Sequence, residues 1–399
     1  MRYMNVLQVV NEFAMDGGVG SSVRSLERSL GNYHGMNIDT LVEFSDLYGD
    51  SRVSQLKRNG YTYPAIGPGS TLDLMKQYDV IHLHTFPSYQ TLSLIEQHKE
   101  SLPKIILTCH SNVKTDFATH IEHSRKQFEK GKMSAHEWLK LQQQIPALND
   151  HNNHTDTMWG YAMARQERSI NIADYVHHMN PAYLKSIIDT YGSDPAKHKI
   201  IPWGVQIKPK QPLTPNNSIL YCGRFSGEKG IDELLEAIPL AQAKDNNIMF
   251  EFAGGTPAEV LEAKQKLAQY NADLQKVTFH GWVSDKNKLE QIYQNNATVV
   301  APSKDESFGL AIAEALNNSR VVLMTPTDSL RSSFIDKRMG LPLYDRTPEG
   351  IASSLVDTIN RPSHELVKIG SDSKDALDAH YNIDNIMNQF AGLYRGSTS

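Results

Sequence analysis

Secreted, membrane-spanning and nucleic-acid-binding proteins have sequence features that this chain largely lacks. Its 399 residues include two cysteines, Cys109 and Cys222, and each closes a predicted strand in a different half. We therefore expect no disulfide framework and a cytoplasmic protein. No apolar run approaches the length of a membrane span, and the N-terminus enters a predicted strand almost at once, so no signal peptide is expected. A formal net charge of -5 argues against nucleic acid as a partner.

Metal-binding motifs are also missing. No Asp-x-Asp occurs, which removes the commonest carboxylate arrangement for a divalent cation bound to a nucleotide diphosphate. His82 and His84 share a face of a predicted strand, but no third ligand accompanies them, which favours one core histidine and one at the ligand-binding edge. Two other pairs have ligand-like spacing in polar surroundings typical of solvated faces: His120 with His123, and His151 with His154. We expect no metal and no bound cofactor.

Both halves of the chain alternate short apolar β runs with amphipathic helices, which predicts an α/β fold of two Rossmann-like, doubly wound parallel sheets. The proline-rich run 200–215 lacks periodicity and is interpreted as a linker between domains at 1–203 and 204–380. In the first half we expect strands at 5–10, 38–44, 79–84 and 104–110, and helices at 21–30, 53–58 and 92–99. In the second half we expect strands at 218–222, 248–253, 276–280, 298–301 and 321–324, and helices at 231–243, 257–270, 286–295 and 308–317.

The segment 112–172 interrupts this alternation. It holds helical stretches at 117–130 and 134–144, a polar loop at 149–156 and a third helical stretch leading to Glu167. Such a segment is long for a single connection, and long excursions tend to be lids or binding elements. A peripheral helical decoration has equal weight as an interpretation.

Glycines follow the first predicted strand and open a helix, in the order Gly17, Gly18, Val19, Gly20. Glycine lets backbone N–H groups approach a phosphate, and a helix N-terminus supplies a favourable dipole. A flexible glycine turn is the simplest alternative. A dinucleotide fingerprint with Glu43 as its acidic residue is another, but the Gly-Gly-x-Gly spacing disfavours it.

The loop 223–230 places two cations, Arg224 and Lys229, after a predicted strand. Arginine can hold phosphate oxygens bidentately, and lysine acts as a point charge. A solvated βα loop is the alternative. In the same half, Glu306 and Glu314 flank a predicted helix start. At a helical rise of ~1.5 Å per residue they would lie about 12 Å apart, close to the span of a nucleotide sugar, with free N–H groups between them for a diphosphate. A capped αβ corner is the alternative there.

Three runs, 277–283, 299–303 and 306–316, together resemble the retaining glycosyltransferases of family 4, which have the GT-B fold. The resemblance spans nearly the whole chain and implies that the two domains face an interdomain cleft, with a last helix at 381–399 crossing back to the first domain. It implies that Arg224 and Lys229 bind the donor diphosphate, that Glu306 binds the donor sugar and Glu314 the ribose, and that His110 lies beside the sugar. Further donor contacts are implied for these residues: Gly17, Gly18, Val19, Gly20, Gly223, Val283, Phe308, Gly309 and Leu310.

The sequence departs from the family pattern at 319–330, where a Gly-x-Pro-Val strand and a Gly-Gly loop are replaced, and at Gln206, where the family usually has aspartate. The hypothesis that results is a metal-independent, retaining hexosyltransferase that uses a nucleotide diphosphate sugar, most simply a UDP-sugar, and a hydroxyl acceptor. Front-face displacement is the expected mechanism, and acceptor recognition is assigned to 112–172. The alternatives are a nucleotide-sugar epimerase, a sugar phosphorylase, or a catalytically silent sugar-nucleotide-binding scaffold.

A weak peripheral membrane contact is the remaining question about partners. The basic residues that suggest it are Arg125, Lys126, Lys130 and Lys132. Glutamates among them dilute the positive charge, so a solvated helix face is favoured.

Overall fold

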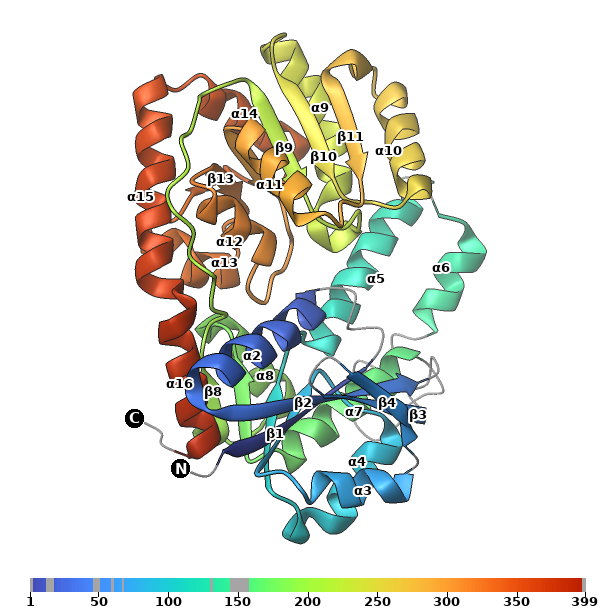
Figure 1. Cartoon of the computed structure of the whole chain (residues 1–399). Coiled ribbons are helices and arrows are strands. Elements are labelled where there is room, and N and C mark those ends of the chain that lie inside the picture. Colours follow the sequence, from blue (N-terminus) through green and yellow to red (C-terminus); the bar gives the residue numbers. More distant parts are fainter. Residues whose placement is uncertain are drawn as a thin grey trace. The chain divides into compact units, whose positions relative to one another are not determined.

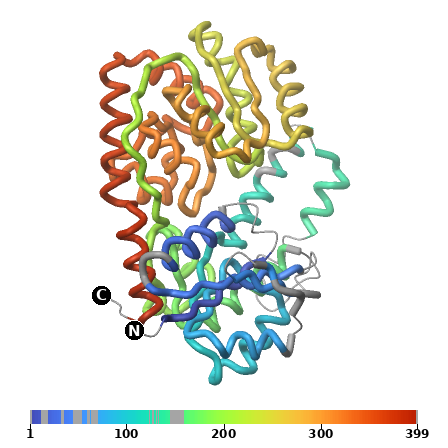
Figure 2. The backbone as a smooth tube through the Cα atoms, in the orientation of Figure 1, coloured from blue at the N-terminus to red at the C-terminus, as the bar shows by residue number. Residues whose placement is uncertain are grey.

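The computed structural model describes residues 3–11, 18–45, 51–58, 61–66, 68–129, 131, 133–143 and 158–396. The chain divides into two compact units, one made of Met1–Trp203 with Asp384–Ser399 and the other of Gly204–Ile383 (Figure 1, Figure 2). Helix α16 (Ile383–Arg395) therefore belongs, apart from its first residue, to the first unit. The predicted loop 149–156 and Gly17 lie outside the described residues.

The first unit is built on an eight-stranded sheet in the order β4-β3-β2-β1-β5-β6-β7-β8. Strands β1, β2 and β5 to β8 pair in parallel, as the alternation of elements predicts. The order reverses at β1, between β2 and β5, and ligands of open α/β sheets bind at the carboxyl ends beside such a reversal. The strand bounds are β1 (Met4–Asn11), β2 (Met36–Ser45), β3 (Ser51–Arg58), β4 (Tyr61–Ile66), β5 (Val80–His84), β6 (Lys104–Thr108), β7 (Tyr175–His178) and β8 (His198–Ile200).

The prediction of a helix at 53–58 is wrong, because these residues lie in β3, which pairs antiparallel with β2 and β4. Ser54 and Leu56 are buried, whereas Gln55 and Lys57, which alternate with them, are only half-buried, and this alternation has the period of two of a strand. So few residues of this segment are apolar that its hydrophobic pattern does not identify a strand. The segment is a strand because it pairs with β2 and β4. The first sheet is therefore mixed and not wholly parallel.

Helices surround this sheet, and apolar side chains of the central strands form the core beneath them. Leu7, Leu83 and Leu107, from three neighbouring strands, are fully buried. The described α-helices of this unit before α16 are α2 (Gly18–His34), α3 (Pro68–Met75), α4 (Tyr89–His98), α5 (Val113–Glu129), α6 (Ala135–Gln142), α7 (Met158–Ile172) and α8 (Pro181–Tyr191), of which α6 lies beside α5 and away from the sheet (Figure 1). Helix α16 packs on the same unit, where Phe390 stacks on Trp203 with ring centroids 5.5 Å apart.

The second unit has a six-stranded, wholly parallel sheet in the order β11-β10-β9-β12-β13-β14. Its strands are β9 (Ser218–Cys222), β10 (Met249–Ala253), β11 (Val277–Gly281), β12 (Thr298–Ala301), β13 (Val321–Met324) and β14 (Leu341–Pro342). The predicted bounds of β9, β12 and β13 are confirmed. This agreement has a physical reason, since strands buried on both faces are continuous apolar runs that polar loops bound on either side.

Helices of the second unit are α9 (Ile231–Lys244), α10 (Pro257–Gln269), α11 (Lys286–Asn295), α12 (Leu310–Asn317), α13 (Asp328–Ser333), α14 (Pro348–Ile359) and α15 (Ser363–Tyr381). The core between the sheet and α9, α10 and α14 is apolar and includes Phe250, Leu234 and Leu355, all at most 1% exposed. The order of elements here is the repeated βα alternation predicted for this half.

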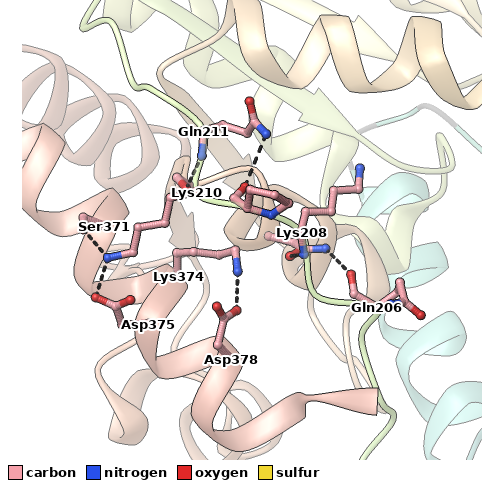
Figure 3. Close-up of polar contacts among 11 residues, drawn as sticks. Gln206, Lys208, Lys210, Gln211, Ser371, Lys374, Asp375 and Asp378 are labelled. Carbon is pink, nitrogen blue, oxygen red and sulfur yellow. Dashed lines mark hydrogen bonds and ion pairs between the residues drawn. The ribbon is translucent and has the colours of Figure 1, made fainter. Parts of the chain in front are cut away.

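The proline-rich segment that follows Trp203 is an ordered part of the second unit (Figure 3). Lys210 Nζ donates to Asp375 at 2.6 Å and to Ser371 at 2.9 Å, both on α15. The Gln206 carbonyl accepts a hydrogen bond from Asn317 Nδ2 at 2.9 Å. The contact at position 206 is therefore made by the backbone carbonyl, which a residue of any type would supply. These contacts anchor the segment on α12 and α15.

Candidate functional site

Three loops at the carboxyl edge of the second sheet are held together through glycines. A Cβ on Gly254, whose φ is +139°, would lie 1.9 Å from the Gly223 carbonyl oxygen. A Cβ on Gly230, with φ +70°, would lie 2.1 Å from the Pro302 carbonyl oxygen. Only glycine fits such approaches at these dihedral angles. The loop after β9, which carries Arg224 and Lys229, is therefore fixed against the loops after β10 and β12.

This packing brings Lys229 to Glu306. Lys229 Nζ donates to Glu306 Oε1 at 2.9 Å, and Ser303 Oγ donates to the same oxygen at 3.0 Å. The side chains of Lys229 and Glu306 are 21% and 16% exposed, so solvent and ligands still reach the pair. Ser303, three residues before Glu306, was not predicted as a site residue from the sequence.

Arg224 makes a different ion pair. Its side chain is 65% exposed and its guanidinium pairs with Glu228 in the same loop. The Arg224 carbonyl accepts a hydrogen bond from Tyr221 Oη at 2.5 Å, which fixes the backbone of the loop while the side chain extends into solvent. The guanidinium is thus available to a ligand at the cost of one exposed ion pair, which contributes little to stability.

Helix α12 begins at Leu310, two residues later than predicted. Gly309 has φ +90° and precedes the helix without a side-chain cap, while the buried Phe308 ring packs against Phe334 and Tyr381. Helical rise, from which a separation of about 12 Å between Glu306 and Glu314 was inferred, applies only from Leu310 onward, because Glu306 lies in the loop before the helix. The N–H groups of the first turn remain open to an anion at this uncapped end.

Glu314 lies in the second turn of α12 with its side chain exposed. Tyr293 Oη, from α11, donates to Glu314 Oε2 at 3.3 Å. Desolvation by the surrounding protein raises the pKa of the Glu314 carboxyl, against the lowering effect of Tyr293, Lys208 and Lys286. The Glu314 carboxylate is positioned by Tyr293 and remains accessible to solvent, so it can accept hydrogen bonds from two neighbouring hydroxyls of a ligand. Val283, just after β11, is half-buried beside Trp282, which is 64% exposed.

In the first unit, the described part of the glycine run lies at the start of α2. Gly18 is the first residue of that helix, Val19 is half-buried and Gly20 is buried. Glu43 cannot serve as the acidic residue of a dinucleotide-binding fingerprint. It is fully buried and accepts hydrogen bonds from Ser88 and Thr91 at the start of α4. Glu43 therefore caps a helix and is not placed to bind a ribose.

His110 follows β6 at the carboxyl edge of the first sheet. Its ring stacks on Trp203 with centroids 5.8 Å apart, and its Nε2 lies 3.2 Å from Nδ1 of His84. Desolvation, with a smaller effect of His177, lowers the pKa of His110 to about 3. The imidazole is therefore neutral at physiological pH. Thr85, which follows His84 in the chain, has φ +68°. This conformation is uncommon for a β-branched residue, and it turns the chain after β5.

Within the described part of the chain, no three histidine, cysteine, aspartate or glutamate side chains are grouped so that they could hold a metal ion. Among the described helices, none combines the length and the apolar character that crossing a membrane requires. His82 and His84, which share a strand, are both buried among hydrogen-bonding partners.

The sequence matches a known family over part of its length. Residues 216–361 match the family described as glycosyl transferases group 1. An uncharacterized glycosyltransferase from Methanocaldococcus jannaschii is 25% identical over 177 residues, which cover 44% of this chain and 44% of that protein. A D-inositol 3-phosphate glycosyltransferase from Frankia alni is 27% identical over 195 residues, 44% of this chain and 48% of that protein. The chain thus spans less than half the length of these curated relatives.

Solved structures match along almost the whole chain. A sucrose-phosphate synthase from Thermosynechococcus elongatus has a TM-score of 0.68 and 18% identity, with 98% of both chains covered. The Anabaena protein HepE in complex with UDP and glucose has a TM-score of 0.65 and 14% identity, and the match covers 98% of this chain and 100% of that one. Identities this low show the fold alone. Residues 216–361 therefore match the family of group 1 glycosyltransferases, and the chain as a whole has the GT-B fold.

Proposed function

We propose that the protein is a retaining, metal-independent glycosyltransferase that moves a hexosyl group from a nucleotide diphosphate sugar to a hydroxyl acceptor. The observation that carries the proposal is the Lys229–Glu306 ion pair beside the uncapped start of α12. It places a cation, a carboxylate and free backbone N–H groups at the carboxyl edge of the second sheet. These are the groups that a sugar diphosphate requires.

In this proposal the donor diphosphate is bound by Lys229, by Arg224 and by the N–H groups of Phe308, Gly309 and Leu310. Arg224 exchanges its exposed pairing with Glu228 for phosphate oxygens. Lys229 has three ammonium donors, so it can keep Glu306 and still contact phosphate.

The carboxylates bind the two sugars of the donor. Glu306 accepts hydroxyls of the hexose through the oxygen that Lys229 and Ser303 leave free, and Glu314 accepts the ribose hydroxyls. Gly223 and Val283 complete the donor contacts in this unit. From the other unit, Gly17, Gly18, Val19, Gly20 and His110 contribute, as the family resemblance implies.

We take UDP as the nucleotide, since HepE is named in complex with UDP and with UDP-glucose. A starch synthase from Arabidopsis thaliana with 14% identity is named in complex with ADP, which makes ADP-sugars the first competing donors to test. Because Cys109 and Cys222 are both free, we place the protein in the cytoplasm.

Transfer would proceed on one face of the sugar. The bond between the anomeric carbon and the diphosphate oxygen breaks, and a bond to the acceptor oxygen forms on the same face. The departing phosphate gains negative charge and takes the acceptor proton. Lys229, Arg224 and the start of α12 stabilise that charge as it develops, which is where preorganised cations and dipoles lower a barrier most. No metal ion enters this scheme.

The decisive experiment is a thermal-shift screen with UDP- and ADP-sugars, followed by product analysis, in buffers with EDTA and with added Mg²⁺. A donor that binds the folded protein must raise its melting temperature. The proposal expects a shift with one sugar nucleotide, transfer with retained anomeric configuration, and equal rates with and without EDTA. Conversion of donor to another sugar nucleotide would favour an epimerase, and binding without turnover would favour a scaffold. Inverted products would refute retention.

A further inference from the structure

A line of hydrogen bonds connects the interior of the first unit to His110. Gln8 of β1 donates from Nε2 to the Val23 carbonyl of α2 at 3.3 Å. Gln8 Oε1 lies 2.9 Å from His84 Nε2, and His84 Nδ1 lies 3.2 Å from His110 Nε2. Gln8 and His84 are at most 1% exposed, so the line is shielded from water up to its last member.

The Gln8 amide gives this line a direction. A carbonyl such as that of Val23 only accepts, so the amide nitrogen of Gln8 faces it and the amide oxygen faces His84. His84 must therefore donate from Nε2, which leaves its Nδ1 as an acceptor. That acceptor takes the proton of His110 Nε2, so the remaining nitrogen of His110, Nδ1, carries a lone pair. Among the described residues, none hydrogen-bonds to Nδ1 of His110.

The surroundings keep both rings neutral, as this arrangement requires. Desolvation, with the nearby His82, His110 and His177, holds the pKa of His84 well below its ordinary value. Trp203, which is 3% exposed, stacks on the His110 ring with an interplanar angle of 21° and fixes its plane. The orientation, the tautomer and the neutral charge of the His110 ring are thus determined by the protein before any ligand binds.

We propose that Gln8 and His84 are positioning residues that hold His110 as its Nε2–H tautomer, so that Nδ1 accepts a hydrogen bond from a hydroxyl of the donor sugar. The inference rests on the proposed function, because a sugar must occupy the position beside His110. It assigns His110 the role of a fixed acceptor and not that of a proton shuttle.

A second histidine line in the same sheet ends differently. It runs from Tyr394 Oη through His82, Thr108 and His177 to the Ile201 carbonyl, with successive distances of 2.6, 2.6, 2.9 and 2.6 Å. Both of its ends are buried protein groups, so it ties α16 to the sheet and presents no open acceptor. It therefore provides a matched control for damage to buried hydrogen bonds.

The substitution Gln8→Met removes the acceptor of His84 and keeps the length of the side chain. An unpaired N–H group of His84 that is buried would cost free energy. This cost is avoided when His84 carries its proton on Nδ1, where His110 is the available partner. Donation from His84 Nδ1 forces the proton of His110 onto Nδ1. The sugar hydroxyl would then meet a donor in place of an acceptor.

Imidazole ¹⁵N NMR on the full chain tests this directly, with the His110 signals assigned by the variant His110→Asn. In the wild-type protein we expect His110 as a neutral Nε2–H tautomer that does not titrate between pH 5 and 8. In Gln8→Met we expect the Nδ1–H tautomer, at least tenfold weaker binding of the UDP-sugar found by the thermal-shift screen, and unchanged binding of UDP. Thr108→Val, which damages the other line, should leave the His110 tautomer and the ratio of the two affinities as in the wild type.

Several results would overturn the proposal. One is a wild-type His110 that carries its proton on Nδ1 or titrates near neutral pH, and this measurement depends on no variant other than His110→Asn, which assigns the signals. Another is a flipped tautomer in Gln8→Met without loss of affinity for the sugar. Absence of binding of every sugar nucleotide to the wild-type protein would instead refute the proposed function, and the tautomer result would still stand.

Discussion

Lys229 Nζ lies 2.9 Å from Glu306 Oε1, although the two residues are 77 positions apart in the sequence. Gly230 allows this pairing, because any other residue there would clash with the Pro302 carbonyl oxygen. The pair therefore links the cation of one loop with the carboxylate of another at the carboxyl edge of the second sheet.

Replacing Lys229 by alanine should reduce glycosyl transfer by roughly 10²- to 10³-fold, since a preorganised donor aimed at developing charge has about that effect. Its partly exposed ion pair contributes only about 1 kcal/mol to folding, so the melting temperature should change by a few degrees at most. Lys266→Ala is the matched control, because Lys266 pairs with Asp232 at 2.8 Å with similar exposure away from the site. Wild-type turnover in the Lys229→Ala variant would contradict the assignment.

The role of Glu314 can be tested with 2′-deoxy-UDP. If its carboxylate binds the ribose hydroxyls, the wild-type protein should bind UDP about tenfold or more tightly than 2′-deoxy-UDP, because hydrogen bonds to a charged group contribute about 1.5–3 kcal/mol. Isothermal titration of Glu314→Gln should show this preference greatly reduced. Glu306→Gln, which alters the carboxylate proposed for the hexose, should keep it. A preference that survives in Glu314→Gln would place the ribose elsewhere.

The substitution Gly254→Ala should destabilise the second unit by about 3 kcal/mol or more, through backbone strain and overpacking together. The new methyl would lie 1.9 Å from the Gly223 carbonyl oxygen. Gly281→Ala separates the two causes, since Gly281 has φ +66° with nothing within 4 Å of the added Cβ, and strain alone costs about 1–2 kcal/mol. Urea unfolding of both variants measures the difference, and equal losses would show that the contact with Gly223 is unimportant.

Buried neutral histidines should make the first unit sensitive to acid. Desolvation lowers the pKa of His177 to about 4 and holds those of His82 and His84 well below 6.5. The unfolded chain binds these protons below about pH 6.5 and the folded chain does not, so stability present above that pH is lost as pH falls. Each such group contributes a slope of about 1.4 kcal/mol per pH unit.

His177→Gln tests the sign and the size of this effect. Glutamine can still accept from Thr108 and donate to the Ile201 carbonyl, so the fold should persist. Between pH 4.5 and 6 the slope of unfolding free energy against pH should fall by about one proton, or roughly 1.4 kcal/mol per pH unit. An unchanged slope in urea unfolding across this range would show that His177 is protonated in the folded protein.

The second unit was the more predictable of the two. Its strands are buried apolar runs such as 298–301 and 321–324, and their bounds agree with the sequence because each run is long enough to give a clear signal. The prediction for the segment 53–58 was wrong for the opposite reason. The segment is polar and forms a strand only because it pairs with β2 and β4. The start of α12 was misplaced by two residues because the left-handed Gly309 delays the helix.

The sequence alone determined the α/β class, the order of elements and the residue types that a sugar nucleotide needs, because periodicity and loop chemistry are local. Tertiary structure decided which of those residues meet. It joined Lys229 to Glu306, it buried Glu43 as a helix cap, and it aligned Gln8, His84 and His110. Contacts between residues far apart in the chain depend on how strands are ordered and how closely glycine loops approach, and neither is encoded in any short stretch of residues.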